Sequence, residues 1–171
     1  MDKRFDYPSI VAVKIALKNG DKILLIREPE TNDWMPGRLG LPGGKLMLNE
    51  SLPQAIERKI KTEIGLEIEI KGIVRIVDIL MPEKNVYHFV LLADYISGEI
   101  NTSQTESSEI KWFEQKEIKN LSVDDFTEYY NSEIIKQVLA GNAEIIPMSA
   151  IKVQDNREKE VLDWMEKGKI N

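Results

Sequence analysis

The segment GGKLMLNESLPQAIERKIKTEIGL, residues 43–66, is the most informative part of the sequence. Its two leading glycines carry no Cβ, so the backbone there can approach a ligand or an ion closely. Ser51 fits the first position of a capping box, and Pro53 suits the first turn of a helix, where its missing N–H costs little. Gly65 is a typical helix stop. The segment therefore predicts a glycine loop followed by a helix over roughly 52–64.

The predicted helix carries two charges inside its apolar face. At about 100° per residue, one broad arc collects the apolar side chains Leu52, Ala55, Ile56, Ile60 and Ile64. Lys59 and Glu63 fall within this arc, one turn apart, so both should face a sheet. An inward charge is costly unless it is paired, and Glu63 is the nearest candidate partner for Lys59. Alternatively, Lys59 extends along its aliphatic stem to solvent.

The rest of the chain is expected to supply strands around this helix. Residues 9–17 and 21–28 flank Asn19-Gly20, a hairpin signal in which both turn positions take positive φ. Further strands are expected at 66–81, 86–96 and 109–113, followed by a helix from Asp124 or Asp125 to about residue 140 and a last helix over 156–167. Strand pairs before and after one internal helix predict an α/β fold with a mixed sheet.

The composition excludes several classes of site. The chain has 171 residues, which suits one domain, and a formal net charge of −6, which argues against a broad nucleic-acid surface. With no cysteine and a single histidine, neither a disulfide framework nor a multi-histidine zinc site can form. No signal peptide or membrane-spanning apolar stretch is evident, so we expect a cytoplasmic protein that does not enter a membrane.

The glycine loop and helix together resemble the Nudix box, the signature of the Nudix hydrolase family. The family pattern is Gly, five residues, Glu, seven residues, then Arg-Glu-aliphatic-x-Glu-Glu-x-Gly-aliphatic. The matching positions are Gly44, Glu50, Arg58, Ile60, Glu63, Gly65 and Leu66. Together with the flanking hairpin and the later Trp112-Phe113 strand, the resemblance extends over roughly 9–140.

The resemblance implies an α/β/α sandwich with a mixed sheet. It also implies hydrolysis of a diphosphate linked to another group, with water attacking phosphorus while Mg²⁺ or Mn²⁺, held by clustered glutamates, neutralises the phosphate oxygens. We expect a Nudix domain over 1–140. Residues 141–171 would then form an extension with a helix, packed on the domain or at the interface of a possible homodimer.

The box departs from the family pattern at its metal-binding positions. Lys59 and Thr62 replace two of three glutamates, so only Glu63 keeps its carboxylate. Glu63 and a carbonyl of the glycine loop, best Gly44, could hold one Mg²⁺ or Mn²⁺ weakly, because Mg²⁺ often keeps several waters. A larger metal cluster is not expected.

Other residues are candidates for the remaining roles. Glu106 and Glu109 are the best substitutes for the lost catalytic acids, although such residues are more commonly solvated surface acids. The candidates for substrate binding are Arg38, Gly43, Gly44 and Lys59. Glu50 and Arg58, eight residues apart, should form an ion pair that locks the loop to the helix.

Two functions follow from these features. The family resemblance favours a hydrolase that cleaves the pyrophosphate bond of a nucleoside diphosphate derivative with the help of a divalent metal. The loss of glutamates favours a catalytically inactive Nudix module that binds a small nucleotide-like or phosphate ligand, with Lys59 replacing the charge of the metal.

Overall fold

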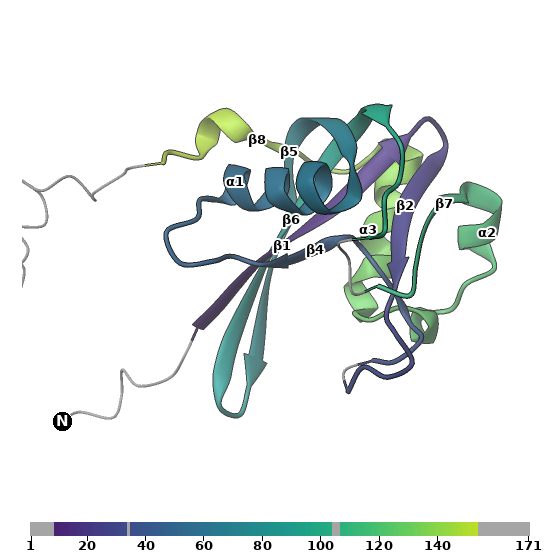
Figure 1. The fold of residues 1–171 in the computed structure, drawn as a ribbon, viewed down its shortest axis with the longest axis horizontal. Helices are drawn as coiled ribbons and strands as arrows, with labels where there is room; N and C mark the ends of the chain where they lie inside the picture. Colours follow the sequence, from purple (N-terminus) through teal and green to yellow (C-terminus); the bar gives the residue numbers. More distant parts are fainter. Residues whose placement is uncertain (1–8, 34, 104–106, 154–171) are drawn as a thin grey trace, which may run out of the picture.

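The computed structural model describes residues 9–33, 35–103 and 107–153 (Figure 1). The strands are β1 (Ser9–Asn19), β2 (Lys22–Arg27), β3 (Leu39–Gly40), β4 (Gly43–Lys45), β5 (Leu66–Met81), β6 (Lys84–Gly98), β7 (Glu109–Glu114) and β8 (Ile146–Pro147). The helices are α1 (Leu52–Glu57), η2 (Arg58–Thr62), α2 (Gln115–Lys119), η3 (Val123–Asp125), α3 (Tyr129–Ala140) and η4 (Met148–Ala150). Within these ranges, no helix is long and apolar enough to cross a membrane.

The strands form one mixed sheet in the order β3-β2-β1-β6-β5-β8. The pairing of β1 with β6 is parallel, and the other strand pairs are antiparallel. Along its other edge, β1 pairs with β2 only at Lys18 and Asn19, and with β4 at residues 12–14. Beyond the hairpin, β2 therefore leaves β1 and pairs along its full length with β7. This divergence opens the sheet beside β4.

Helices cover both faces of the sheet, as expected for an α/β/α sandwich. On one face, Val13, Ile15 and Leu17 of β1 pack with Ile56 and Ile60 of the central helix. On the other face, a second cluster joins β1 and β2 to α3. Figure 1 shows the β5–β6 hairpin extending beyond these layers. Because both faces are covered, the middle of β1 is buried almost continuously.

The central helix is continuous over 52–64, as predicted, but its second half is π-helical. α1 begins at the Ser51 capping box and ends at Glu57, and η2 then follows with π-type hydrogen bonding. The backbone N–H of Glu63 donates to the carbonyl of Arg58, five residues earlier. Residues five positions apart are thereby brought to the same side of the helix, which a pure α-helix would not do.

Two local predictions were wrong. The hairpin turn lies at Gly20-Asp21 because Asn19 still pairs with Lys22, and only Gly20 takes positive φ. The later helix begins at Tyr129, because Asp125 instead caps the short η3 turn by accepting from the backbone N–H of Ser122.

The end of the chain is described only in part. β8 pairs with Gly72 and Ile73 of β5, and η4 follows it. The helix predicted over 156–167 lies outside the described residues.

Candidate functional site

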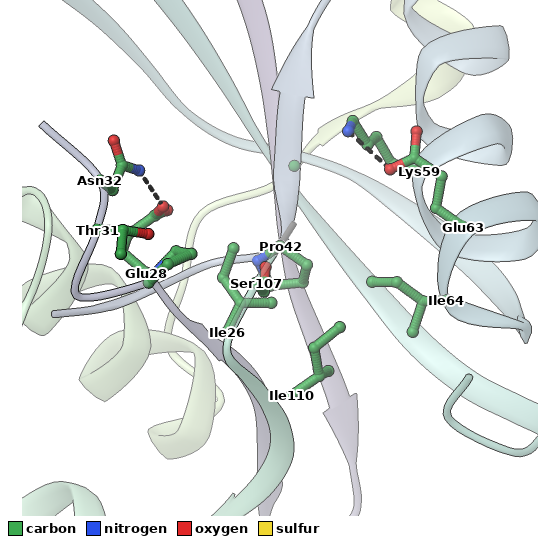
Figure 2. Close-up of a pocket in the computed structure, with 12 residues that line it drawn as sticks. Ile26, Glu28, Thr31, Asn32, Pro42, Lys59, Glu63, Ile64, Ser107 and Ile110 are labelled. Carbon is green, nitrogen blue, oxygen red and sulfur yellow. Dashed lines mark hydrogen bonds and ion pairs between the residues drawn. The ribbon is translucent and has the colours of Figure 1, made fainter. Parts of the chain in front are cut away.

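A pocket of about 640 Å³ lies where the sheet opens beside the central helix. We call it the helix–loop pocket; its lining residues are Ile26, Glu28, Pro29, Thr31, Asn32, Pro42, Gly43, Lys59, Glu63, Ile64, Ser107 and Ile110. Figure 2 shows Lys59 and Glu63 on the helix at one side of the pocket, and Glu28, Thr31 and Asn32 opposite them. The pocket therefore has two polar walls with apolar side chains between them.

The two glycines of the loop are needed for different close approaches. A Cβ at Gly43 would overlap the backbone carbonyl oxygen of Val13 in β1, so this glycine lets β4 pack against β1. A Cβ at Gly44 would overlap Cε of Lys59 and lie 3.0 Å from its Nζ. The Lys59 side chain therefore lies directly over the glycine loop.

Four charged side chains join the loop to the helix in one cluster. Arg58 forms an ion pair with Glu50, with Nε 2.7 Å from Oε1 and Nη2 2.8 Å from Oε2. Arg58 Nη1 also donates to Glu63 Oε1 at 3.0 Å, and Lys59 Nζ donates to Glu63 Oε2 at 2.7 Å. Both carboxylate oxygens of Glu63 thus accept from a cation. The contact of Arg58 with Glu63, five residues apart, depends on the π-helical turn.

The cluster is sheltered from solvent. Between 11% and 23% of each of these four side chains is exposed. The hydrogen bond from Arg58 is the main cause that lowers the pKa of the Glu50 carboxyl, and the hydrogen bond to Glu50 raises the pKa of Arg58. The pair therefore stays ionised at neutral pH and fixes the loop on the helix.

A family model described as NUDIX domain matches residues 8–133. The chain belongs to the Nudix family. Over 112 residues it is 30% identical to the uncharacterized Nudix hydrolase YvcI of Bacillus subtilis, covering 61% of this chain and 66% of that protein. It is 29% identical over 116 residues to an ADP-ribose pyrophosphatase of Methanocaldococcus jannaschii, covering 67% of each. The chain thus spans about two thirds of the length of these relatives.

Solved Nudix structures share the fold. A MutT protein from Methanosarcina mazei Go1 superposes with a TM-score of 0.66 at 24% identity, covering 82% of this chain and 99% of that one. A NUDIX hydrolase from Nitrosomonas europaea gives a TM-score of 0.70 at 20% identity, covering 86% and 98%. The expected α/β/α architecture is confirmed by these neighbours.

Nudix hydrolases generally use a divalent metal such as Mg²⁺, but the residues of the helix–loop pocket do not fit a cluster of such ions. The Glu63 carboxylate, the single acid that the box retains at its metal-binding positions, is paired at both oxygens with Arg58 and Lys59. Within residues 9–33, 35–103 and 107–153, no three acidic or histidine side chains lie close enough together to hold a metal ion. Hard divalent cations need several oxygen ligands. Here the Lys59 ammonium lies among the oxygen atoms that were expected to bind the metal ion.

The predicted site residues separate into those that the fold brings together and those that it does not. Gly43, Lys59 and Glu63 line the helix–loop pocket, and Gly44 lies beneath Lys59. Glu109 does not line it. Strand alternation turns Ile110 towards the pocket, whereas Glu109 pairs with Arg27 at 3.0 Å.

Arg38 does not line the helix–loop pocket either, and its role in substrate binding stays a prediction. Arg38 lines a different hollow of about 370 Å³ beside Asp124 and Asp125. It lies there because β3, which follows it, pairs with the end of β2. The remaining candidate acid, Glu106, lies outside the described residues.

Sequence reasoning missed the opposite wall of the pocket. Glu28 follows β2 and lines the pocket, and its Oε2 accepts a hydrogen bond of 2.8 Å from Asn32 Nδ2. Glu28 lies two residues after Ile26, so both side chains point to the same face of the strand, and both line the pocket. The alternation of β2 was the one available signal, but it does not reveal which face meets the helix.

Proposed function

We propose that this chain binds a nucleoside diphosphate derivative in the helix–loop pocket, and that binding rather than turnover is its function. The observation that carries this proposal is the placement of the Lys59 ammonium over the glycine loop, at the wall where a diphosphate would meet the helix. Lysine binds phosphate as a point charge. The Nudix family acts on small nucleotide derivatives, which supports this class of ligand.

The opposite wall suits the rest of such a ligand. The Glu28 carboxylate is an acceptor and can receive hydrogen bonds from sugar hydroxyls or from amino groups of a base. Ile26 and Ile110 provide apolar surface between the two walls. A molecule with an anionic end and a donor-rich end therefore matches the charge distribution of the pocket.

Calorimetry tests this proposal with ADP-ribose, nucleoside diphosphates and nucleotide sugars. Lys59→Met should weaken the binding of the best ligand by about 10- to 100-fold, because a hydrogen bond to a charged group is lost. Lys61→Met is the matched control, since Lys61 lies on the same helix but is exposed and pairs with Glu67. Equal affinities of wild type and Lys59→Met would contradict the proposal, as would the absence of binding by every compound.

Metal-assisted hydrolysis is the second candidate. Glu28 faces the helix wall across the pocket, which favours it as a second acid opposite Glu63. A single Mg²⁺ or Mn²⁺ would then rest on Glu63 and a glycine-loop carbonyl. Phosphate release that requires Mn²⁺ or Mg²⁺ and disappears in Glu63→Gln would establish this function and reject binding alone.

Residues 141–171 are proposed as an extension of the Nudix domain, and a homodimer as the assembly. Pairing of β8 with β5 supports an extension that packs on the sheet. The exposed Ile76 and Leu80 of the β5–β6 hairpin support an interface there. Light scattering after size-exclusion chromatography measures the assembly; a monomeric mass would reject the homodimer. The cytoplasmic location stays a prediction.

A further inference from the structure

We infer that Lys59 takes the place of a divalent cation in the helix–loop pocket, so that ligand binding does not require Mg²⁺ or Mn²⁺. The ligand part of this inference rests on the proposed function. The part that concerns the metal does not, because it can be tested without any ligand.

The position of the ammonium carries the argument. Glu63 and the glycine-loop carbonyl were the two expected ligands of a metal ion. Lys59 Nζ lies 2.7 Å from Glu63 Oε2, and its side chain covers Gly44 so closely that an added Cβ would overlap Lys59 Cε. A divalent cation at the same place would meet a positive charge in direct contact, which opposes its binding.

The charges around this position lead to the same conclusion. Glu50 and Glu63 are balanced by Arg58 and Lys59, so the cluster has no net charge. A divalent cation would therefore find no excess of negative charge. Changing Lys59 and Thr62 to glutamate would restore the family pattern and make the same cluster more negative by three charges.

Lys59 can still bind phosphate oxygens, as a metal ion would. An ammonium has three N–H donors, so the group that donates to Glu63 can also donate to phosphate oxygens. Glu63 orients the ammonium, and Arg58 on the other carboxylate oxygen orients Glu63. The cation is therefore held in place before the ligand arrives, with no metal bound.

The first test is a titration of the ligand-free protein with Mn²⁺, with free Mn²⁺ measured by electron paramagnetic resonance. Wild type should bind Mn²⁺ no more tightly than millimolar, whereas K59E/T62E should bind it about tenfold more tightly or better, because affinity for hard cations rises with the number of carboxylates. The control Lys61→Glu makes the same change of charge as the Lys59→Glu half of the double variant, but on the exposed side of the helix, and should leave Mn²⁺ binding unchanged.

Tight Mn²⁺ binding by wild type that Glu63→Gln removes would overturn the inference. So would folded K59E/T62E that binds Mn²⁺ no better than wild type. If circular dichroism shows that this variant does not fold, Lys59→Gln replaces it. The neutral side chain should still raise Mn²⁺ affinity measurably, and an unchanged affinity would overturn the inference.

The second test compares ADP-ribose binding in EDTA and in Mg²⁺. Wild-type affinity should be the same in both, and K59E/T62E should bind ADP-ribose only with the metal present. Loss of wild-type binding in EDTA would overturn the inference. If ADP-ribose does not bind under either condition, the proposed ligand is wrong for that compound, while the Mn²⁺ titration still decides the role of Lys59.

Discussion

Glu50 holds the loop before the helix through contacts of a single side chain. Its two oxygens accept from Arg58, and Oε2 also accepts from the backbone N–H of Met47 at 2.9 Å. Asn49, which lies between Met47 and Glu50 in the chain, takes a left-handed conformation with φ of 62°, which asparagine tolerates better than most residues. One carboxylate therefore fixes both the turn and its attachment to the helix.

At this scale we expect Glu50→Gln to lower the free energy of unfolding at neutral pH by about 1–3 kcal/mol, because Arg58 loses a charged partner. The pKa of Glu50 is lowered in the folded state, so its contribution is present above the ordinary glutamate pKa and is lost as the pH falls through the folded value. Urea unfolding at neutral and acidic pH measures the difference.

The matched control is Glu57→Gln, which changes an exposed acid on the same helix and should alter stability by less than about 0.5 kcal/mol. A stability difference between Glu50→Gln and wild type that does not shrink on acidification would contradict the role assigned to the carboxylate.

The central helix acquires its chemistry from a change of helical type. α1 presents apolar residues to the sheet, and η2 then turns Arg58, Lys59 and Glu63 into one cluster. The strand β4 lies beneath this turn, and its glycines set how close the helix can come. Helix and glycine loop therefore act as one unit.

The two glycines of β4 should respond differently to the same substitution. Gly43→Ala should destabilise the fold by about 1–3 kcal/mol, because the new methyl meets the backbone of β1, which cannot move aside. Gly44→Ala should cost less stability, because the methyl meets the flexible end of Lys59. It should nevertheless weaken ligand binding, since Lys59 must leave the loop. Thermal unfolding and calorimetry distinguish the two; equal destabilisation would contradict the packing described.

At the scale of the whole molecule, a buried polar contact joins the sheet to α3 on the face opposite the helix–loop pocket. His88 Nδ1 lies 2.5 Å from the Tyr130 hydroxyl, and Lys14 pairs with Glu128 at 3.2 Å beside them. Burial lowers the pKa of His88, and the charge of Lys14 lowers it further against the opposing effect of Glu128.

Protonation of His88 should therefore loosen the attachment of α3. Because the folded pKa lies below the unfolded value of about 6.5, the stabilisation is complete above that pH and is lost as the pH falls towards the folded pKa. Thermal midpoints measured between neutral and mildly acidic pH should fall more steeply for wild type than for His88→Gln. Parallel curves would exclude His88 as the titrating group.

The accuracy of the sequence interpretation depended on how far apart the interacting residues lie in the chain. Periodicity and spacing were sufficient to predict the features that involve residues within a few turns of one another. These features are the glycine loop, the capping box, the extent of the helix and the Lys59–Glu63 contact. The hairpin turn was displaced by one residue because local propensity for Asn19-Gly20 competes with strand pairing. The start of the later helix was misplaced because this segment contains more than one possible cap. Asp125 caps the short η3 turn and not the longer helix that was expected to begin there.

The sequence by itself determined the Nudix box, its missing glutamates and the mixed α/β architecture, because these depend on residue identity and short-range spacing. Tertiary structure alone decided that Glu28 enters the pocket while Glu109 pairs with Arg27 and Arg38 lines another hollow. The reason is that a strand places successive side chains on opposite faces, and only its pairing within the sheet decides which face meets the helix.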